Sequence, residues 1–178
     1  MQINKITTGN LPNEINVIIE IPMNGNPVKY ELDKESGAIF VDRFIQVSMF
    51  YPCNYGFIPH TLSGDGDPVD VLVLSNYPIV PGAVIKCRPI GVLMMEDESG
   101  VDEKIIAVPV DKVDISFSNI NHISDIDNNT KLRIQHFFER YKDLEKDKWV
   151  KVLDWESAET AKKLIEEGVK RLNDVQNK

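Results

Sequence analysis

The amino-acid sequence predicts a mainly β fold with flanking helices, of the α+β class, in which short antiparallel strands form a barrel and two main helices follow near the C-terminus. Three observations lead to this prediction. Strand-like segments separated by turn residues occupy the first two thirds of the chain, two segments of helical periodicity close it, and neither a repeat nor a linker divides it. The 178 residues are therefore expected to form a single domain over 1–178, large enough to bury a core without disulfides.

The first two strands are predicted from alternating patterns. In 15–21, isoleucine and valine occupy every second position, and Glu20 lies opposite the more apolar face. In 28–32, apolar side chains alternate with Lys29 and Glu31, so these two charged side chains share a face. Further strands are predicted at 38–42, 69–74, 83–95 and 104–110. Many short strands joined by turns favour a closed or nearly closed barrel.

Two helices are predicted toward the C-terminus. The first begins near Asp127 or Asn128, either of which can cap it, and ends near Lys142. The second begins at about Ser157. The residues expected to face the barrel are Leu132, Phe137, Phe138 and Tyr141 in the first helix and Ala161, Leu164, Ile165, Gly168 and Leu172 in the second.

Composition restricts the class of function. The chain has 28 acidic residues against 20 Lys and Arg, for a formal net charge of −8, so it has no general attraction for nucleic acid or anionic membranes. Cys53 and Cys87 give no disulfide framework, the N-terminus lacks a basic, apolar signal sequence, and no apolar run approaches the length of a membrane span. A cytoplasmic protein with neither nucleic-acid nor membrane partners is expected.

The segment Asp65-Gly66-Asp67-Pro68-Val69-Asp70 is the most informative stretch. At roughly 4 Å and an effective dielectric constant near 20, two carboxylates repel by about 4 kcal/mol, so the crowding of three calls for a cation. Proline and glycine shape the loop, and oxygen ligands suit Mg²⁺, Mn²⁺ or Ca²⁺. An EF-hand is excluded because Asp70 and Asn76 stand where it needs glycine and glutamate.

A solvated acidic turn is the alternative interpretation of this segment. It is weakened by the apolar run 69–74, because Asp70 lies where the turn enters a buried strand and a carboxylate there needs a partner. A second acidic segment, 96–104, reads as a hairpin tip with a Ser-Gly turn. Within it Asp102 and Lys104 are two residues apart, so their side chains would point to one face. Such a pair could bind a metal-bound phosphate, or it could be a surface ion pair that contributes little.

The third group is Arg43 followed by the aromatic segment 50–59. Phe50 and Phe57 are predicted to lie in the core. Tyr51 and Tyr55 carry hydroxyl groups that need a partner when buried, which can be a phosphate oxygen, a metal-bound water or a structural hydrogen bond. The remaining pair, Tyr141-Lys142 near a helix end, is uninformative by itself. The histidines have no zinc-binding spacing, and no nucleophile or nucleotide-binding motif supports covalent catalysis.

These groups occur together in an order that resembles one known family. Its signature, acidic–any–acidic–proline–apolar–aspartate–apolar, is met by Asp65-Gly66-Asp67-Pro68-Val69-Asp70-Val71. The signature is accompanied by Glu20, Lys29, Glu31, Arg43, the Tyr51–Gly56 stretch, Asp97, Asp102, Lys104, Tyr141 and Lys142. On these residues the chain resembles the family I soluble inorganic pyrophosphatases of the short bacterial type.

The resemblance implies an oligonucleotide-binding-like (OB-like) five-stranded barrel with flanking helices, assembled as a homohexamer. It implies hydrolysis of pyrophosphate to two orthophosphates by a metal-bridged hydroxide, without a covalent intermediate. The implied cofactor is Mg²⁺, several ions per active site, with Mn²⁺ or Zn²⁺ as substitutes and Ca²⁺ as an inhibitor.

The resemblance also implies roles for individual residues. Asp65, Asp70 and Asp102 would hold the first metal, Asp70 would bridge to a second, Asp97 and Asp102 would serve a metal that arrives with the substrate, and Glu20 would act through water. The implied substrate-binding residues are Lys29, Arg43, Tyr55, Lys104, Tyr141 and Lys142, with Glu31 and Tyr51 in support. Asp67 is the natural general base because it lies between two metal ligands, although it could equally bind metal.

Two other classes of function compete with this enzyme. A barrel that binds single-stranded nucleic acid would explain the aromatic stretch 51–57, but the charge of −8 opposes it. A passive divalent-cation binder would need only the loop 65–70 and would leave Lys29, Arg43, Lys104 and Lys142 without a purpose.

Overall fold

The computed structural model describes residues 3–177. Its helices are η1 (Ile3–Lys5), η2 (Ile115–Phe117), η3 (Ile123–Asp125), α1 (Asn128–Arg140) and α2 (Ala158–Gln176). Its strands are β1 (Gly9–Asn10), β2 (Glu14–Ile21), β3 (Val28–Leu32), β4 (Ile39–Phe44), β5 (Asn54–Phe57), β6 (Asp70–Val73), β7 (Val84–Asp97), β8 (Gly100–Val101), β9 (Lys104–Pro109) and β10 (Val150–Glu156). The predicted class, mainly β with flanking helices, is confirmed.

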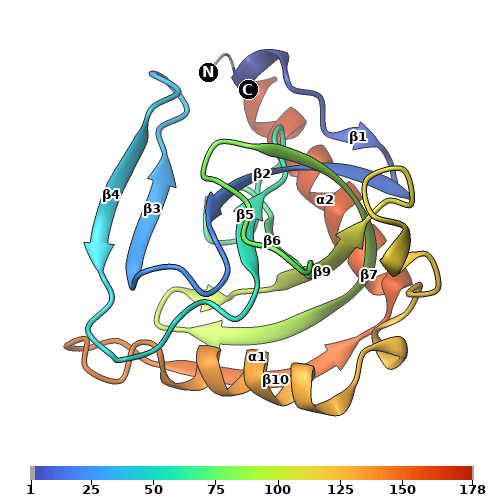
Figure 1. Cartoon of the computed structure of the whole chain (residues 1–178). Coiled ribbons are helices and arrows are strands. Elements are labelled where there is room, and N and C mark those ends of the chain that lie inside the picture. Colours follow the sequence, from blue (N-terminus) through green and yellow to red (C-terminus); the bar gives the residue numbers. More distant parts are fainter. Residues whose placement is uncertain (1–2, 178) are drawn as a thin grey trace.

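The central feature is a closed ring of strands (Figure 1). The order is β2-β5-β6-β9-β7, and β7 pairs with β2 to close the ring. Four of these pairings within residues 3–177 are antiparallel, but β6 and β9 are parallel. The fully antiparallel barrel predicted from the sequence is therefore wrong at this pair. The chain travels from β6 to β9 through β7 and β8, and so long a connection permits a parallel neighbour.

Side chains from the two faces of the strands form two main apolar clusters. One cluster joins Leu72 and Ile106 to Phe137 and Phe138 of α1. The other joins residues such as Val71 and Ile105, from the opposite faces of the same strands, to Ala161 and Ile165 of α2. Each helix thus covers apolar side chains of the barrel, as the helical stripes predict. The prediction is wrong for Leu132, which is 53% exposed on the outer face of α1.

Both helices begin at the predicted caps. The Asp127 side chain accepts a hydrogen bond from the backbone of Thr130 at 3.0 Å, and the Ser157 hydroxyl accepts one from Thr160 at 3.2 Å. Helix α1 runs along β10 at one side of the barrel (Figure 1). It ends at Arg140, so Tyr141 follows directly as its C-terminal cap, beside Lys142.

Three local predictions differ from the structure. The segment 50–59 contains strand β5, and 150–156 forms strand β10, although neither was predicted as a strand. Phe57 is buried as predicted, but Phe50 is 54% exposed because it precedes β5 in a loop outside the core. Strands β3 and β4 form a separate hairpin beside the barrel (Figure 1).

Two remaining features concern the chain as a whole. Within residues 3–177, the helices are too short or too polar to cross a lipid bilayer. Cys53 and Cys87 are free and buried, and burial raises the pKa of Cys53 to about 12. Both thiols are therefore inert at neutral pH.

Candidate active site

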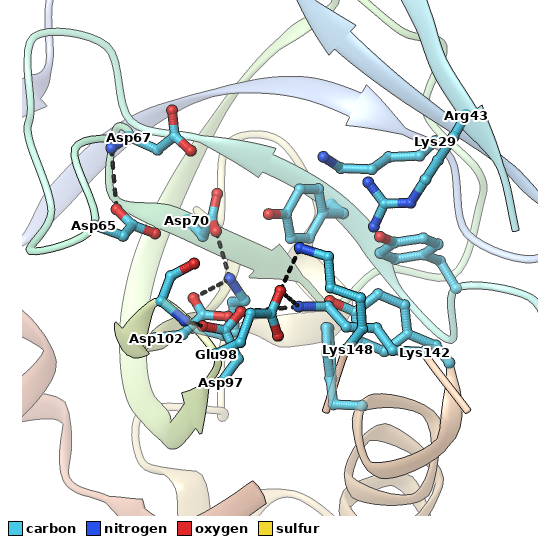
Figure 2. Close-up of a pocket in the computed structure, with 16 residues that line it drawn as sticks. Lys29, Arg43, Asp65, Asp67, Asp70, Asp97, Glu98, Asp102, Lys142 and Lys148 are labelled. Carbon is cyan, nitrogen blue, oxygen red and sulfur yellow. Dashed lines mark hydrogen bonds and ion pairs between the residues drawn. The ribbon is translucent and has the colours of Figure 1, made fainter. Parts of the chain in front are cut away.

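A cavity of about 250 Å³ brings most of the predicted site residues together. Its lining includes twelve of them: Lys29, Arg43, Tyr51, Tyr55, Asp65, Asp67, Asp70, Asp97, Asp102, Lys104, Tyr141 and Lys142. Glu20 and Glu31 line a smaller neighbouring cavity of about 60 Å³, which shares Lys29, Tyr55, Asp67 and Asp70 with the first. In Figure 2, Asp65, Asp67 and Asp70 lie on one side of the main cavity, and Lys29 and Arg43 lie on the other.

The parallel pairing of β6 and β9 creates the central charge cluster. Asp70 and Lys104 are partners across the two strands, and Asp102 precedes Lys104 by two residues. The Lys104 ammonium donates to both Asp70 Oδ2 and Asp102 Oδ1. Burial lowers the pKa of Lys104, but the charges of Asp70 and Asp102 outweigh burial and hold that pKa well above its usual value. The ammonium is thus permanently charged.

The loop 65–70 is shaped by its own polar atoms. Asp65 Oδ1 accepts a hydrogen bond from the backbone N–H of Asp67 at 3.0 Å, and Gly66 between them has φ of +96°, a conformation that favours glycine. The Asp67 side chain is 70% exposed and lies 4.0 Å from the Lys34 ammonium. Asp65 and Asp67 are therefore held at the mouth of the cavity, while Asp70 reaches its floor.

A second charge cluster closes another side of the cavity. Lys142 donates to Asp97 Oδ2 at 2.8 Å and to Glu98 Oε1 at 3.5 Å. Glu98 also accepts from the Lys148 ammonium at 2.5 Å. Burial raises the pKa of Glu98, but the hydrogen bond from Lys148 and the charge of Lys142 outweigh it and lower the pKa to about 2. Glu98 is therefore ionised at neutral pH.

The cations of β3 and β4 are held from outside the main cavity. Asp42 Oδ2 accepts from Lys29 at 3.1 Å and from Arg43 at 2.7 Å. Arg43 Nε also donates to Glu145 Oε1 at 3.2 Å. Because Asp42 and Glu145 do not line the main cavity, they orient Lys29 and Arg43 while leaving the cavity side of those groups available.

Three buried tyrosines turn their hydroxyl groups to the cavity. Tyr51, Tyr55 and Tyr141 form no side-chain hydrogen bond to other residues within 3–177, yet no fully buried polar side-chain atom there lacks a partner, so these hydroxyl oxygens lie at the cavity surface. The rings of Tyr51 and Phe137 pack with centroids 4.6 Å apart. Burial raises the pKa of each tyrosine, so all three are neutral hydrogen-bond donors.

Glu20 lines the smaller cavity, which it shares with Asp70, and not the main cavity. It is buried in β2 and accepts a hydrogen bond from the backbone N–H of Leu32 at 2.7 Å. Burial raises its pKa to about 7, although the Leu32 hydrogen bond opposes this. Glu31, on β3, is exposed at the edge of the same smaller cavity.

Sequence reasoning missed four charged residues that complete the arrangement: Asp42, Glu98, Glu145 and Lys148. The first two had a local signal, because Asp42 adjoins Arg43 and Glu98 lies in the acidic segment 96–104. Glu145 and Lys148 had none, since they lie beyond the last residue of the resemblance and reach the site only through folding.

The carboxylate oxygens of the cavity are suitable ligands for a hard divalent cation. Asp70 and Asp102 already converge on one cationic atom, the Lys104 ammonium, and Asp65 and Asp97 line the same cavity. Within residues 3–177, however, no three His, Cys, Asp or Glu side chains are close enough to bind one ion as they stand. Lys104 lies between Asp70 and Asp102 and donates to both, so a metal bound by these two carboxylates would have to displace its ammonium.

The arrangement suits a small, highly charged anion that arrives with metal ions. Carboxylates for cations, fixed ammonium and guanidinium groups, and neutral hydroxyl donors all face one cavity of about 250 Å³. Residues 17–173 match the family model described as Inorganic pyrophosphatase. The chain belongs to the inorganic pyrophosphatase family. The family is metal-dependent, and membership confirms the predicted enzyme class, inorganic diphosphatase.

Individual relatives agree with this membership. The inorganic pyrophosphatase of Rickettsia bellii is 67% identical over 172 residues, which cover 97% of this chain and 98% of that protein. A crystal structure of an inorganic phosphatase from Anaplasma phagocytophilum has a TM-score of 0.93 at 53% identity and covers 95% of this chain and 99% of its own. The structure of the inorganic pyrophosphatase from Helicobacter pylori has a TM-score of 0.92 at 50% identity and covers 95% of this chain and 99% of its own.

Proposed function

We propose that this chain hydrolyses inorganic pyrophosphate to two orthophosphates, with Mg²⁺ as cofactor and without a covalent intermediate. The observation that carries the proposal is the cavity itself, in which the carboxylates gathered around Lys104 face the cations of β3 and β4. A pyrophosphate–magnesium complex needs both kinds of group at once. A nucleic acid or a passive cation would need only one of them.

Asp65, Asp70 and Asp102 would hold the first Mg²⁺, with Asp70 shared with a second ion. Asp97 would bind an ion that arrives with substrate, and Glu20 would act through water from the neighbouring cavity. When bound, the ions lower the pKa of a coordinated water and neutralise phosphoryl oxygens. Mn²⁺ or Zn²⁺ would substitute, whereas Ca²⁺, larger and less strict in geometry, would inhibit.

The chain's own groups bind and orient the phosphates. Lys29, Arg43, Lys104 and Lys142 would contact phosphoryl oxygens and stabilise the charge that develops on the leaving phosphate. Tyr55 and Tyr141 would donate hydrogen bonds from their neutral hydroxyl groups. Supporting positions are Glu31, beside Lys29 in the smaller cavity, and Tyr51, packed on Phe137.

Asp67 would accept the proton of the attacking water. Its position supports this role, because its carboxylate is exposed at the cavity mouth and makes no close ion pair deeper in the site. A base at the mouth can pass its proton to solvent after each turnover.

The wider setting is part of the proposal. The chain would act as one domain over 1–178, in the cytoplasm and as a homohexamer, with pyrophosphate as its ligand and neither nucleic acid nor membrane as a partner. The exposed side chains of Phe40, Phe44 and Tyr77 support association between copies. The net charge of −8 supports the lack of a nucleic-acid partner.

A phosphate-release assay tests the proposed reaction. The purified chain should release phosphate from pyrophosphate with Mg²⁺ at neutral to alkaline pH, far faster than from triphosphate or ATP, and EDTA should stop it. Failure to hydrolyse pyrophosphate under these conditions would refute the proposal. A salt-dependent shift of labelled single-stranded DNA in the absence of metal would instead favour nucleic-acid binding.

A further inference from the structure

Lys148 is a cavity cation for which the proposed reaction has no assigned role. It lies in the connection between α1 and β10, directly after Asp147, whose φ is +60°. Lys148 lines the same cavity as Lys29 and Arg43, and Figure 2 places it beside Lys142. Its side chain is 44% exposed, against 9% for Lys142, so it stands at the cavity mouth.

Glu98 fixes this part of the connection through two separate contacts. Its Oε1 accepts from the Lys148 ammonium at 2.5 Å, and its Oε2 accepts from the backbone N–H of Trp149 at 3.4 Å. The next residue, Val150, pairs with Asp97 in the β7–β10 ladder. Side chain and backbone are therefore both held against the tip of the β7–β8 hairpin.

The hydrogen bonds within this cluster are unequal. Glu98 shares Oε1 between two ammonium groups, those of Lys142 and Lys148. Lys142 has a closer partner in Asp97, at 2.8 Å, whereas Lys148 has no other hydrogen-bond or ion-pair partner within residues 3–177. Lys148 can therefore turn from Glu98 to an anion without leaving Glu98 unpaired.

We propose that Lys148 is a further phosphate-binding residue at the cavity mouth and that Glu98 is its positioning residue. This proposal rests on the proposed function, because it concerns the same site and its phosphate ligands. An exposed surface ion pair contributes little to stability, so a purely structural role leaves the placement of Lys148 in the cavity unexplained. A lysine that an anion can draw from its carboxylate explains both the placement and the exposure.

The first test compares Lys148→Ala with Lys146→Ala in Mg²⁺. Lys146 lies in the same connection, is exposed, and does not line the cavity. Lys148→Ala should raise KM for pyrophosphate about tenfold with kcat within about twofold, the size expected for one charge-assisted hydrogen bond at a half-exposed position. Lys146→Ala should leave both unchanged. A KM for Lys148→Ala within twofold of the control, or a fall in kcat without a rise in KM, would overturn the proposal.

The second test does not need turnover. Calorimetry with inorganic phosphate and Mg²⁺ should show about tenfold weaker phosphate binding by Lys148→Ala than by Lys146→Ala. If the wild-type chain binds phosphate but fails to hydrolyse pyrophosphate, the proposed function is refuted while this comparison still decides the role of Lys148. Equal affinities in the two variants would overturn the inference alone.

Chemical rescue separates a cation from a structural contact. Because Cys53 and Cys87 are buried and inert, bromoethylamine should alkylate only the thiol introduced by Lys148→Cys and restore an amine of nearly the original length. KM should return to within threefold of wild type, whereas iodoacetamide, which adds no charge, should not restore it. Rescue by both reagents, or by neither, would contradict a phosphate-binding ammonium.

Glu98→Gln tests the positioning role. This substitution should raise KM severalfold in the wild-type background. In the Lys148→Ala background it should raise KM by a clearly smaller factor, because the ammonium that Glu98 positions is then absent. Glu96→Gln, at the end of β7 two residues before Glu98, is the control for loss of a charge. Full additivity of Glu98→Gln and Lys148→Ala would show that Glu98 does not act through Lys148.

Discussion

Replacing Glu20 by glutamine should change how stability depends on pH. Glu20 is buried in β2, and burial raises its pKa from 4.5 to about 7. In the unfolded chain the carboxyl group ionises near its ordinary pKa, so between about pH 4.5 and pH 7 the folded state holds the proton more tightly. The folded state is therefore favoured at low pH, and this advantage is lost as the pH rises toward 7.

The magnitude follows from the difference between the two pKa values. Each pH unit in the window between them changes the free energy of unfolding by about 1.4 kcal/mol, so the range from pH 5 to above pH 7 amounts to about 2 to 3 kcal/mol. Glutamine has the same shape and keeps an oxygen for the Leu32 N–H, but it does not titrate. The stability of Glu20→Gln minus that of wild type should therefore rise by about 2 to 3 kcal/mol over this range.

Urea unfolding from pH 5 to pH 8.5 in EDTA measures this difference without any contribution from bound cations. Glu35→Gln, at an exposed position, controls for the loss of one negative charge. A Glu20→Gln difference that stays flat within about 0.5 kcal/mol, or that falls as pH rises, would refute the assignment of a burial-raised carboxyl group at this position.

Three further predictions concern the loop 65–70 and the packing of the barrel. Asp70→Asn should abolish phosphate release and weaken Mg²⁺ binding measured by calorimetry. Asp67→Asn should slow turnover but keep most of the Mg²⁺ binding. Equal loss of Mg²⁺ binding in the two variants would contradict their separate roles. Gly56→Ala would place a Cβ 2.0 Å from the Ile18 carbonyl oxygen, so it should destabilise the fold by about 3 kcal/mol or more, and an unchanged urea midpoint would contradict the packing. Phe138→Ala removes a fully buried ring beside the cavity and should lower the free energy of unfolding by about 3 to 5 kcal/mol in urea. A loss of less than about 1 kcal/mol would contradict the packing of this ring.

The fold could be predicted where a local pattern sufficed. The stripe in 157–172 and the cap at Asp127 each determine a helix within a few residues, and both are correct. Strand β10 was not predicted because its alternation stops after Val150 and Val152, where a register shift separates Val152 from Trp155, and because the segment is largely exposed. The parallel pairing of β6 with β9 was not predicted for another reason. The relative direction of two strands depends on the path of the chain between them and has no local signal in the sequence.

The candidate site divides in a similar way. The spacing of Asp65 and Asp70 predicts carboxylates at one place, and all three aspartates of that loop line the cavity. The partners of the cations could not be predicted, because Arg43 and Glu145 are far apart in sequence and meet only when α1 has docked. The metal-binding and substrate-binding roles remain predictions that the variants above would test.

The ion pairs of Lys104 with Asp70 and Asp102 have a consequence for the life of the protein in a cell. The chain supplies its own counterions at its most crowded carboxylates, so the folded state does not depend on a metal to offset their repulsion. A structural zinc domain, by contrast, unfolds when its ion is removed. Under the proposed Mg²⁺ dependence, removal of the ion should therefore leave a folded but inactive chain, protected from proteolysis, that regains activity when the ion returns.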